Sequence, residues 1–138
     1  MPTTKLVGEA KSTIQPTDHP YLTGAWTPVH KEYEVMGLEV LEGSVPQDLA
    51  GVYIRNSENP VHEPIGRYHP FDGDAMLHSV HFHDGQADYR NRFVRTKGFE
   101  AEQKAGRALW AGLAEDPRKS EDPTHNGNFP GAQGSLKD

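Results

Sequence analysis

The sequence contains no cysteine, which excludes disulfide bonds and thiolate metal sites and fits a reducing compartment. Long apolar runs are also missing, and none approaches the roughly 20 residues needed to span a bilayer. The N-terminal residues MPTTKLVGEAKSTIQ lack the apolar core of a secretory signal and are too mixed in charge for a transit peptide. These absences predict a cytoplasmic protein without a transmembrane segment.

Hydrophobic residues are few, and no block of Lys or Arg stands out. The hydrophobic fraction is 34%, whereas Gly and Pro occupy 14 and 11 of the 138 positions, so a turn-rich chain with a small core is expected. With a net charge of -6, the chain lacks the basic surface that binds nucleic acid non-specifically. Nucleic acid is therefore not an expected partner.

Two stretches of the chain show no periodicity. Residues 1–18 form a polar N-terminal lead-in, and residues 115–138, rich in Gly and Pro, are expected to be loop or disordered. The domain itself is expected to cover residues 19–138. Its first segment, residues 19–28, has the turn formers and aromatic rings of an ordered coil that docks by its rings.

The central part of the chain predicts strands followed by a helix. Four segments have the composition of strands, and they are residues 33–41, 51–56, 75–83 and 86–94. Gly37 is expected to mark a bulge. Asp84-Gly85 joins the last two segments and predicts a hairpin with a type I′ turn. Residues 98–114 have helical spacing and predict one helix, broken at Gly106 or Gly112.

Asp72 and Asp74 flank Gly73 in a tight acidic turn. Two carboxylates at this spacing could bind a hard cation or act as a pair in general acid–base catalysis. The further acidic residues of a calcium-binding loop are missing. The favoured interpretation is a turn stabilised by Asx hydrogen bonds, in which these carboxylates accept from backbone N–H groups.

Arg90, Arg92 and Arg95 form a basic cluster after the hairpin turn. Arg90 and Arg92 share one face of the strand and could bind an anionic substrate, with Arg95 on the other face. They could equally form bidentate ion pairs with the Asp72/Asp74 turn, which is the favoured interpretation. No phosphate-binding glycine loop, nucleophile elbow or zinc-protease motif occurs, so no self-sufficient active site is predicted.

His81 and His83 form an H-x-H pair. On a strand both side chains point to the same face, which is one way in which metal sites are built, whereas His78 has the opposite parity. Beside a hairpin turn, such a pair is typical of the solvated face of an antiparallel ribbon. Because no third or fourth ligand is evident near the pair, no metal site is predicted here.

Motifs along residues 19–114 carry a family resemblance. They are YLTGAWTPV at residues 21–29, VPQDLAGVYIRN at residues 45–56 with Asn59-Pro60 after it, YHPFDGDAMLH at residues 68–78 and YRNRFVRT at residues 89–96. In order and spacing these resemble the motifs of the carotenoid cleavage oxygenases, which include the carotenoid, apocarotenoid and lignostilbene dioxygenases. The resemblance implies an N-terminal fragment of such an enzyme.

The implied fold is mainly β, the N-terminal blade portion of a seven-bladed β-propeller with one short helix and long loops. In this family Fe(2+) held by four histidines activates O2 to cleave an alkene bond, and the first of these histidines follows the matched region. The resemblance therefore implies no catalytic, cofactor-binding or metal residue in this chain, with the iron ligands expected beyond Asp138. None of the chain's own histidines lies in the family's ligand motif: His19, His30, His62, His69, His78, His81, His83 and His125.

Several positions depart from the family's motifs. Ser57-Glu58 replaces a Gly-Pro pair, and Ala75 replaces a Gly, which would cost stability if that position required a positive φ. Phe93 stands where stilbene-cleaving members often carry a Tyr that grips a phenol hydroxyl. Lys137 corresponds to a phenol-binding Lys of the same subgroup. Phe93 and Lys137 are thus the candidate residues of the substrate rim, and Phe93 favours an apolar polyene.

The implied function is that of the N-terminal part of a non-heme iron(II) dioxygenase that cleaves a C=C bond of a carotenoid, apocarotenoid or stilbene. Its partners would be an apolar small molecule and O2, with peripheral membrane contact of the intact enzyme as a further option. Three alternatives stay open: an inactive truncated product, an assembly fragment that needs its C-terminal part, and a small β-domain that binds an apolar ligand. Alone, the chain is expected to be inactive, because an incomplete propeller leaves exposed strand edges.

Overall fold

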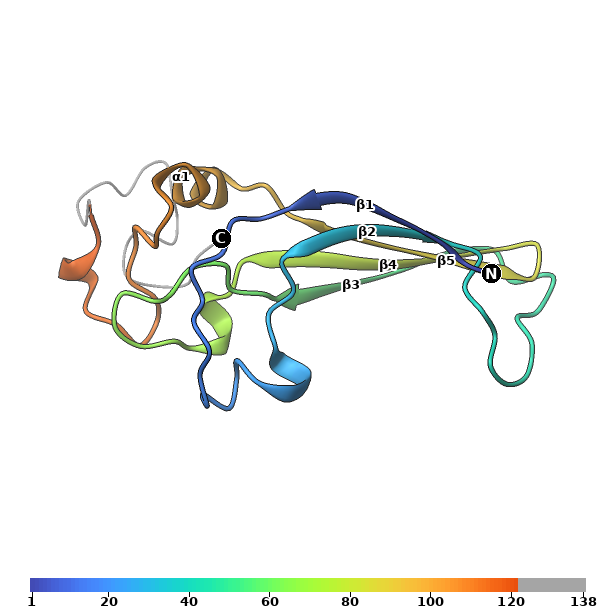
Figure 1. The fold of residues 1–138 in the computed structure, drawn as a ribbon, viewed down its shortest axis with the longest axis horizontal. Helices are drawn as coiled ribbons and strands as arrows, with labels where there is room; N and C mark the ends of the chain where they lie inside the picture. The colour runs from blue at the N-terminus through green and yellow to red at the C-terminus, as the bar shows by residue number, and fades with distance from the viewer. Residues whose placement is uncertain (122–138) are drawn as a thin grey trace. The chain divides into compact units, whose positions relative to one another are not determined.

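A computed structural model describes residues 1–121 of the chain (Figure 1). The chain groups into two compact units, each considered by itself. The first consists of residues 1–9, 31–57 and 76–93, and the second of residues 10–30, 58–75 and 94–121. Lys137 and the part of the predicted loop beyond residue 121 lie outside the described residues.

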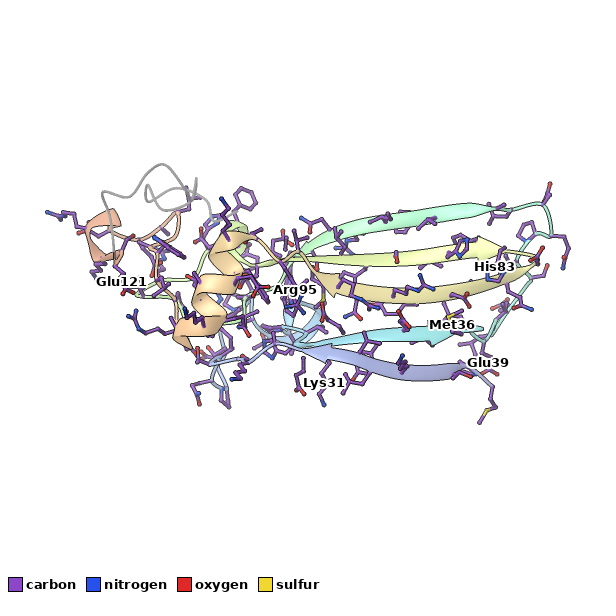
Figure 2. The ribbon with its side chains drawn as sticks, turned by 90° about the horizontal axis from the view of Figure 1, so that it is seen from above. Lys31, Met36, Glu39, His83, Arg95 and Glu121 are labelled. Atoms are coloured by element: carbon purple, nitrogen blue, oxygen red, sulfur yellow. The ribbon has the colours of Figure 1, made fainter. Side chains whose placement is uncertain are left out.

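The first unit is built on a five-stranded sheet in the order β1-β2-β5-β4-β3. Its strands are β1 (Thr3–Glu9), β2 (Lys31–Met36), β3 (Gly51–Glu58), β4 (Ala75–His83) and β5 (Gln86–Phe93). The β1–β2, β2–β5 and β4–β5 pairs are antiparallel. Figure 2 shows Lys31 and Met36 at opposite ends of β2, with His83 at the end of the sheet where Met36 lies.

The hairpin of β4 and β5 is the element that the sequence predicts best. Its register runs without interruption from Met76 opposite Phe93 to His83 opposite Gln86. The turn residues Asp84 and Gly85 have φ of 49° and 71°, and a type I′ turn requires a positive φ at both of its central positions. The hairpin prediction is confirmed.

β1 lies in the stretch for which no secondary structure was predicted. Thr3–Glu9 pairs with β2, with a register shift between Leu6 and Gly8. All of its residues except Gly8 are exposed, so the strand has no buried apolar face to produce an alternating pattern. The strand forms because β2 supplies backbone hydrogen-bond partners. The sequence of residues 1–18 does not predict this pairing, because the partner strand is distant in the chain.

β2 is shorter than predicted, because Gly37 ends the strand instead of forming a bulge within it. Gly37 has a φ of 68°. Its N–H donates to Oδ1 of Asp88 at 2.7 Å, and the N–H of Leu38 donates to the carbonyl of Ala87 at 2.8 Å. The chain after β2 is therefore attached to the start of β5.

Buried polar side chains hydrogen bond to the backbone along the line where β2 and β5 lie side by side. The Cα pairing of these strands covers two residue pairs. On one side of them, the Glu32 carboxylate accepts a hydrogen bond from the N–H of Phe93 at 2.7 Å, and the Asn91 amide oxygen accepts one from that of Tyr33 at 2.6 Å. On the other side Asp88 accepts from the residue that follows β2. Side chains thus replace much of the backbone ladder here.

The sheet has a small apolar core and an open edge. Met76, Ala87 and Phe93 are buried at 0%, 6% and 5% exposure. At the edge strand β3, by contrast, the consecutive residues Val52, Tyr53 and Ile54 are 55%, 61% and 59% exposed. Because neighbouring residues of a strand point to opposite faces, β3 is exposed on both faces.

The second unit contains the short helix α1 (Lys97–Ala105) and the 3-10 turns η1 (Gly24–Trp26), η2 (Pro70–Asp72) and η3 (Pro117–Lys119). The Thr96 hydroxyl caps α1 by accepting from the N–H of Phe99 at 3.0 Å. Gly106, with a φ of 71°, ends the helix at the first of its two predicted break points. Val61, Phe99 and Ala111 are among its buried apolar residues.

The two departures from family glycines cause no backbone strain. Ala75 begins β4 and Ser57-Glu58 ends β3, in regular strand conformation. Asp84 is the one non-glycine residue with a positive φ in the described part of the chain. Ala75 therefore does not cause the loss of stability that a positive φ at this position would bring. No helix within residues 1–121 is long and apolar enough to cross a membrane.

Candidate functional site

The acidic turn holds distant segments of the second unit together. Asp72 and Asp74 are only 6% and 9% exposed. Oδ1 of Asp72 accepts a hydrogen bond from the N–H of Leu113 at 2.8 Å, and Oδ2 of Asp74 accepts one from that of Val61 at 3.1 Å. The carboxylates thus accept hydrogen bonds from backbone N–H groups, but these two donors lie far away in the sequence and are not the local donors of the predicted Asx turn. Both carboxylates act as scaffold.

The arginine cluster is also tied into the scaffold, but with partners other than those predicted. Arg92 pairs with Glu34 across β2 and β5, with Nη2 at 2.6 Å from Oε1. Arg95 lies 3.6 Å from the carboxylate of Glu100 and 5.6 Å above the ring of Phe99. Arg90 is exposed. The predicted pairing of Arg92 with the Asp72/Asp74 turn is wrong, because strand order brings Glu34 to it instead.

Phe93, the described residue of the predicted substrate rim, lies in the core of the sheet. It is 5% exposed, and it stands opposite Met76. Its role at a substrate, like that of Lys137 outside the described residues, stays a prediction.

The second unit contains an aromatic cavity of about 550 Å³. Tyr21 meets Trp26 edge to face, with ring centroids 5.4 Å apart, and His19 meets Tyr68 in the same way at 5.8 Å. Burial, with a smaller contribution from the Glu58 carboxylate, raises the pKa of Tyr68, so its hydroxyl stays neutral. The rings lining the cavity are those of His19, Tyr21, Trp26, Tyr68, His69 and Phe71. Such walls suit a flat apolar group.

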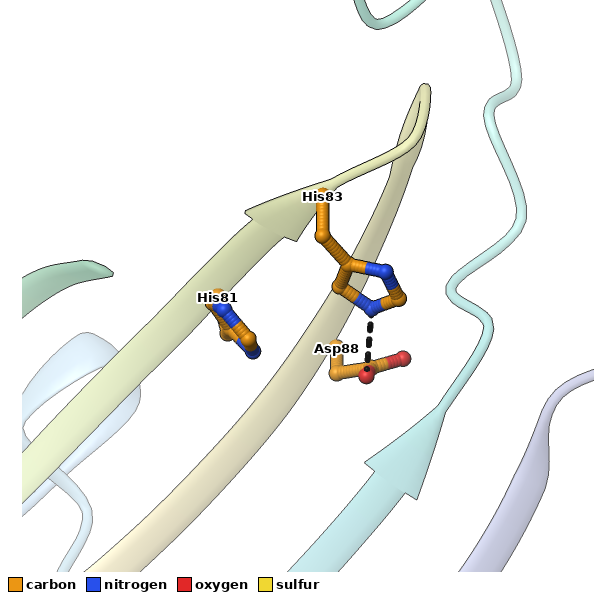
Figure 3. Close-up of side chains that lie close together, drawn as sticks. All are labelled: His81, His83 and Asp88. Carbon is orange, nitrogen blue, oxygen red and sulfur yellow. Dashed lines mark hydrogen bonds and ion pairs between the residues drawn. The ribbon is translucent and has the colours of Figure 1, made fainter. Parts of the chain in front are cut away.

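A cluster of possible metal ligands lies on one face of the hairpin (Figure 3). His81, His83 and Asp88 each present one ligand atom, and these atoms lie within 4.8 Å of one another. Nε2 of His83 is 3.0 Å from Oδ2 of Asp88, and the two imidazole rings are 4.9 Å apart. The expectation of no third ligand is therefore wrong. The predicted turn sets the register that places residue 88 opposite residue 81, so Asp88 could have been found from the sequence.

The Asp88 carboxylate is held in its ionised form. It is 4% exposed, and hydrogen bonds from the Gly37 N–H and from His83 keep its pKa below the usual range. The hydrogen bond to Asp88 is in turn the largest cause of a raised pKa at His83, with a smaller contribution from Asp84. The cluster therefore combines a buried anion with two imidazoles.

His78 belongs to a separate hydrogen-bonded group. Its Nδ1 lies 2.7 Å from the Tyr89 hydroxyl and its Nε2 lies 2.9 Å from the Ser57 hydroxyl, which donates to the carbonyl of Met76. Burial raises the pKa of Tyr89, so that hydroxyl can donate to Nδ1. Burial, and secondly the charge of Arg55, lower the pKa of His78. The neutral ring satisfies all of these contacts.

Acidification is expected to destabilise the folded chain through His78. The pKa of His78 in the folded chain lies below its ordinary value of 6.5. In the pH range between the folded and the unfolded pKa, the unfolded state binds more protons, so the stability of the fold decreases as the pH falls. Urea unfolding at neutral pH and at about pH 5 should show a smaller loss in His78→Gln than in the native chain. Since other histidines are common to both proteins, an equal loss in the two would contradict this role.

The four-histidine iron site that the resemblance implies is not formed by the described residues. Within residues 1–121, the cluster of His81, His83 and Asp88 is the one group of at least three ligating side chains. The buried His62 does not belong to this cluster, and its ring is hydrogen bonded to the Thr13 hydroxyl. A set of four converging imidazoles is not formed by the part of the chain that the structure describes, so no step of a reaction is assigned to iron here.

Comparison with known proteins identifies the family. The family model described as Retinal pigment epithelial membrane protein matches residues 26–135. This chain belongs to the carotenoid cleavage oxygenase family. Among curated members, it is 48% identical over 82 residues to the carotenoid cleavage oxygenase of Mycobacterium tuberculosis, which covers 58% of this chain and 16% of that protein. It is 40% identical over 85 residues to the probable carotenoid cleavage dioxygenase 4, chloroplastic, of Arabidopsis thaliana, covering 62% and 14%.

Solved members of the carotenoid cleavage oxygenase family share the fold. The Pseudomonas brassicacearum lignostilbene dioxygenase superposes with a TM-score of 0.66 at 32% identity, covering 72% of this chain and 21% of that one. Cobalt-substituted Synechocystis ACO gives 0.56 at 36% identity, covering 67% and 20%. The prediction of a mainly β fold that is part of a propeller is confirmed. The matched part of the chain spans roughly one sixth of the length of these curated relatives.

Proposed function

We propose that this chain is the N-terminal part of a non-heme iron(II) dioxygenase that oxidatively cleaves a C=C bond of a carotenoid, apocarotenoid or stilbene. The observation that carries the proposal is the family match over residues 26–135. Within it, the family's motifs keep their order, on a sheet that resembles the solved dioxygenases. The intact enzyme would act in the cytoplasm on an apolar molecule and O2, with peripheral membrane contact as an option.

The part played by this chain in the proposed enzyme is to form one section of the propeller. The iron, when bound, supplies the activation of O2, and its histidine ligands are assigned to residues beyond Asp138. A cobalt-substituted structure of a relative supports a metal in the family. The exposure of β3 on both faces supports a dependence on further strands, so the chain alone is expected to be inactive.

The substrate proposed for the intact enzyme is an apolar polyene rather than a phenolic stilbene. Phe93 has no hydroxyl with which to hold a phenol, and its ring lies among apolar neighbours such as Met76. Lys137 is assigned to the same rim. A phenol placed beside Phe93 would lose a hydrogen-bond partner, at a cost of about 1–3 kcal/mol.

A chimera tests the proposal. Residues 26–121 of this chain would replace the matching segment of the Pseudomonas brassicacearum lignostilbene dioxygenase. The chimera is expected to bind its metal and to cleave an unsubstituted stilbene at a rate within about tenfold of the host's, or about 1.4 kcal/mol of transition-state energy. Phe93→Tyr in the chimera should shift the ratio of kcat/KM values toward a 4-hydroxystilbene over the unsubstituted stilbene by about fivefold, the worth of one hydrogen bond.

The purified chain by itself is the control for this experiment, since it should give no turnover with iron and either substrate. A folded, metal-loaded chimera without cleavage would contradict the proposed function. Turnover by the chain alone with one equivalent of iron would contradict the assignment of the iron ligands.

A further inference from the structure

The hairpin end of the sheet carries a ligand set that the proposed oxygenase function does not use. His81 and Asp88 are directly opposed across β4 and β5, and His83 lies two residues along β4 on the same face. All three side chains therefore lie on the same face, and Figure 3 shows the His83 ring joined to Asp88, with His81 beside them. We propose that His81, His83 and Asp88 form a binding site for a divalent first-row transition metal, with zinc as the representative ion.

The distances require little rearrangement. With Zn–N and Zn–O bonds of about 2.1 Å in tetrahedral arrangement, neighbouring ligand atoms lie about 3.4 Å apart. Nε2 of His83 and Oδ2 of Asp88 are 3.0 Å apart, near that value. The widest separation in the cluster is within 4.8 Å, and the exposed side chain of His81 is free to rotate inward. A metal would thus need the movement of one surface ring.

Outer contacts already orient two of the ligands. The Gly37 N–H holds Oδ1 of Asp88 at 2.7 Å, which leaves Oδ2 directed at His83. On the far side of the His83 ring, Nδ1 lies 3.5 Å from the carboxylate of Asp84. A carboxylate behind a ligating histidine is a common outer partner in metal sites, because it directs the opposite ring nitrogen to the metal.

The donor atoms select the kind of metal. Two imidazoles with one carboxylate suit zinc, copper, nickel or cobalt, whereas calcium and magnesium require mostly oxygen ligands. Three protein ligands leave a fourth position for water. Because Asp88 also binds the residue that follows β2, a metal here would fasten the hairpin end to the chain beyond β2 and raise the unfolding temperature.

Zinc titration of the untagged 138-residue chain tests the site. Competition with a chromophoric chelator is expected to show one equivalent bound, and Co2+ should give the visible absorption of a nitrogen- and oxygen-ligated ion. His81→Gln is expected to weaken zinc binding at least about tenfold, since even outer-partner substitutions cost that much. His69→Gln makes the same change outside the cluster and should leave the affinity unchanged.

Asp88→Asn provides a second variant, because its amide oxygen can still accept from Gly37 while the charged ligand is lost. It should also weaken zinc binding. Circular dichroism establishes that each protein is folded. A folded native chain that binds no zinc, or equal affinity in the native chain and His81→Gln, would overturn the site. Neither result depends on alkene cleavage, so this test and that of the proposed function fail separately.

Discussion

Asn91→Leu is expected to lower the free energy of unfolding by about 3 kcal/mol, because it leaves backbone groups without hydrogen-bond partners. Asn91 is 1% exposed. Its side-chain oxygen accepts from the N–H of Tyr33 at 2.6 Å, and its NH2 group donates to the carbonyl of Lys31 at 2.8 Å. Leucine has a similar volume but neither polar atom, so the boundary between β2 and β5 would lose both bonds.

Urea denaturation followed by far-UV circular dichroism measures this effect. Arg90→Leu, at the exposed neighbouring position of β5, should change the unfolding free energy by no more than about 0.5 kcal/mol. An unchanged urea midpoint for Asn91→Leu would show that the side chain does not hold the strands together.

Gly73→Ala is expected to destabilise the second unit by about 2–3 kcal/mol through a steric clash. A Cβ at this position would lie 2.7 Å from the backbone nitrogen of Asn59 and 2.8 Å from Cβ of Glu58. The Asn59 nitrogen cannot move aside easily, since it donates to the carbonyl of Asp74 at 2.8 Å. Gly73 has an ordinary φ of -68°, so the requirement for glycine comes from close approach and not from backbone conformation.

Gly66→Ala is the matched control, because a Cβ there would make an ordinary contact at 3.5 Å with the Glu115 side chain. Thermal unfolding of the two variants should show a lower midpoint for Gly73→Ala alone. Equal midpoints for both variants would mean that the Asp72–Asp74 turn has room to adjust.

The features predicted correctly are those encoded by residues close together in the chain. Asp84-Gly85 adopts positive φ values and closes a hairpin, and Gly106 ends α1. The features missed depend on partners that are distant in the sequence. Arg92 pairs with Glu34, and Asp72 accepts a hydrogen bond from Leu113. Two-residue turns and helix caps are short-range, whereas the choice of an ion-pair partner depends on strand order.

The family, the mainly β character and the hairpin of this protein can be recognised from its residues without the fold, because the order of the motifs and the chemistry of a two-residue turn are properties of the chain. That Thr3–Glu9 is a strand becomes evident in the folded chain alone, since an exposed edge strand has no apolar pattern and needs β2 beside it. The predicted turn makes Asp88 a foreseeable neighbour of His81 and His83, whereas the distances that make the three a possible metal site come from the folded chain. Register across two strands brings these ligands together, and proximity in space is what a metal site requires.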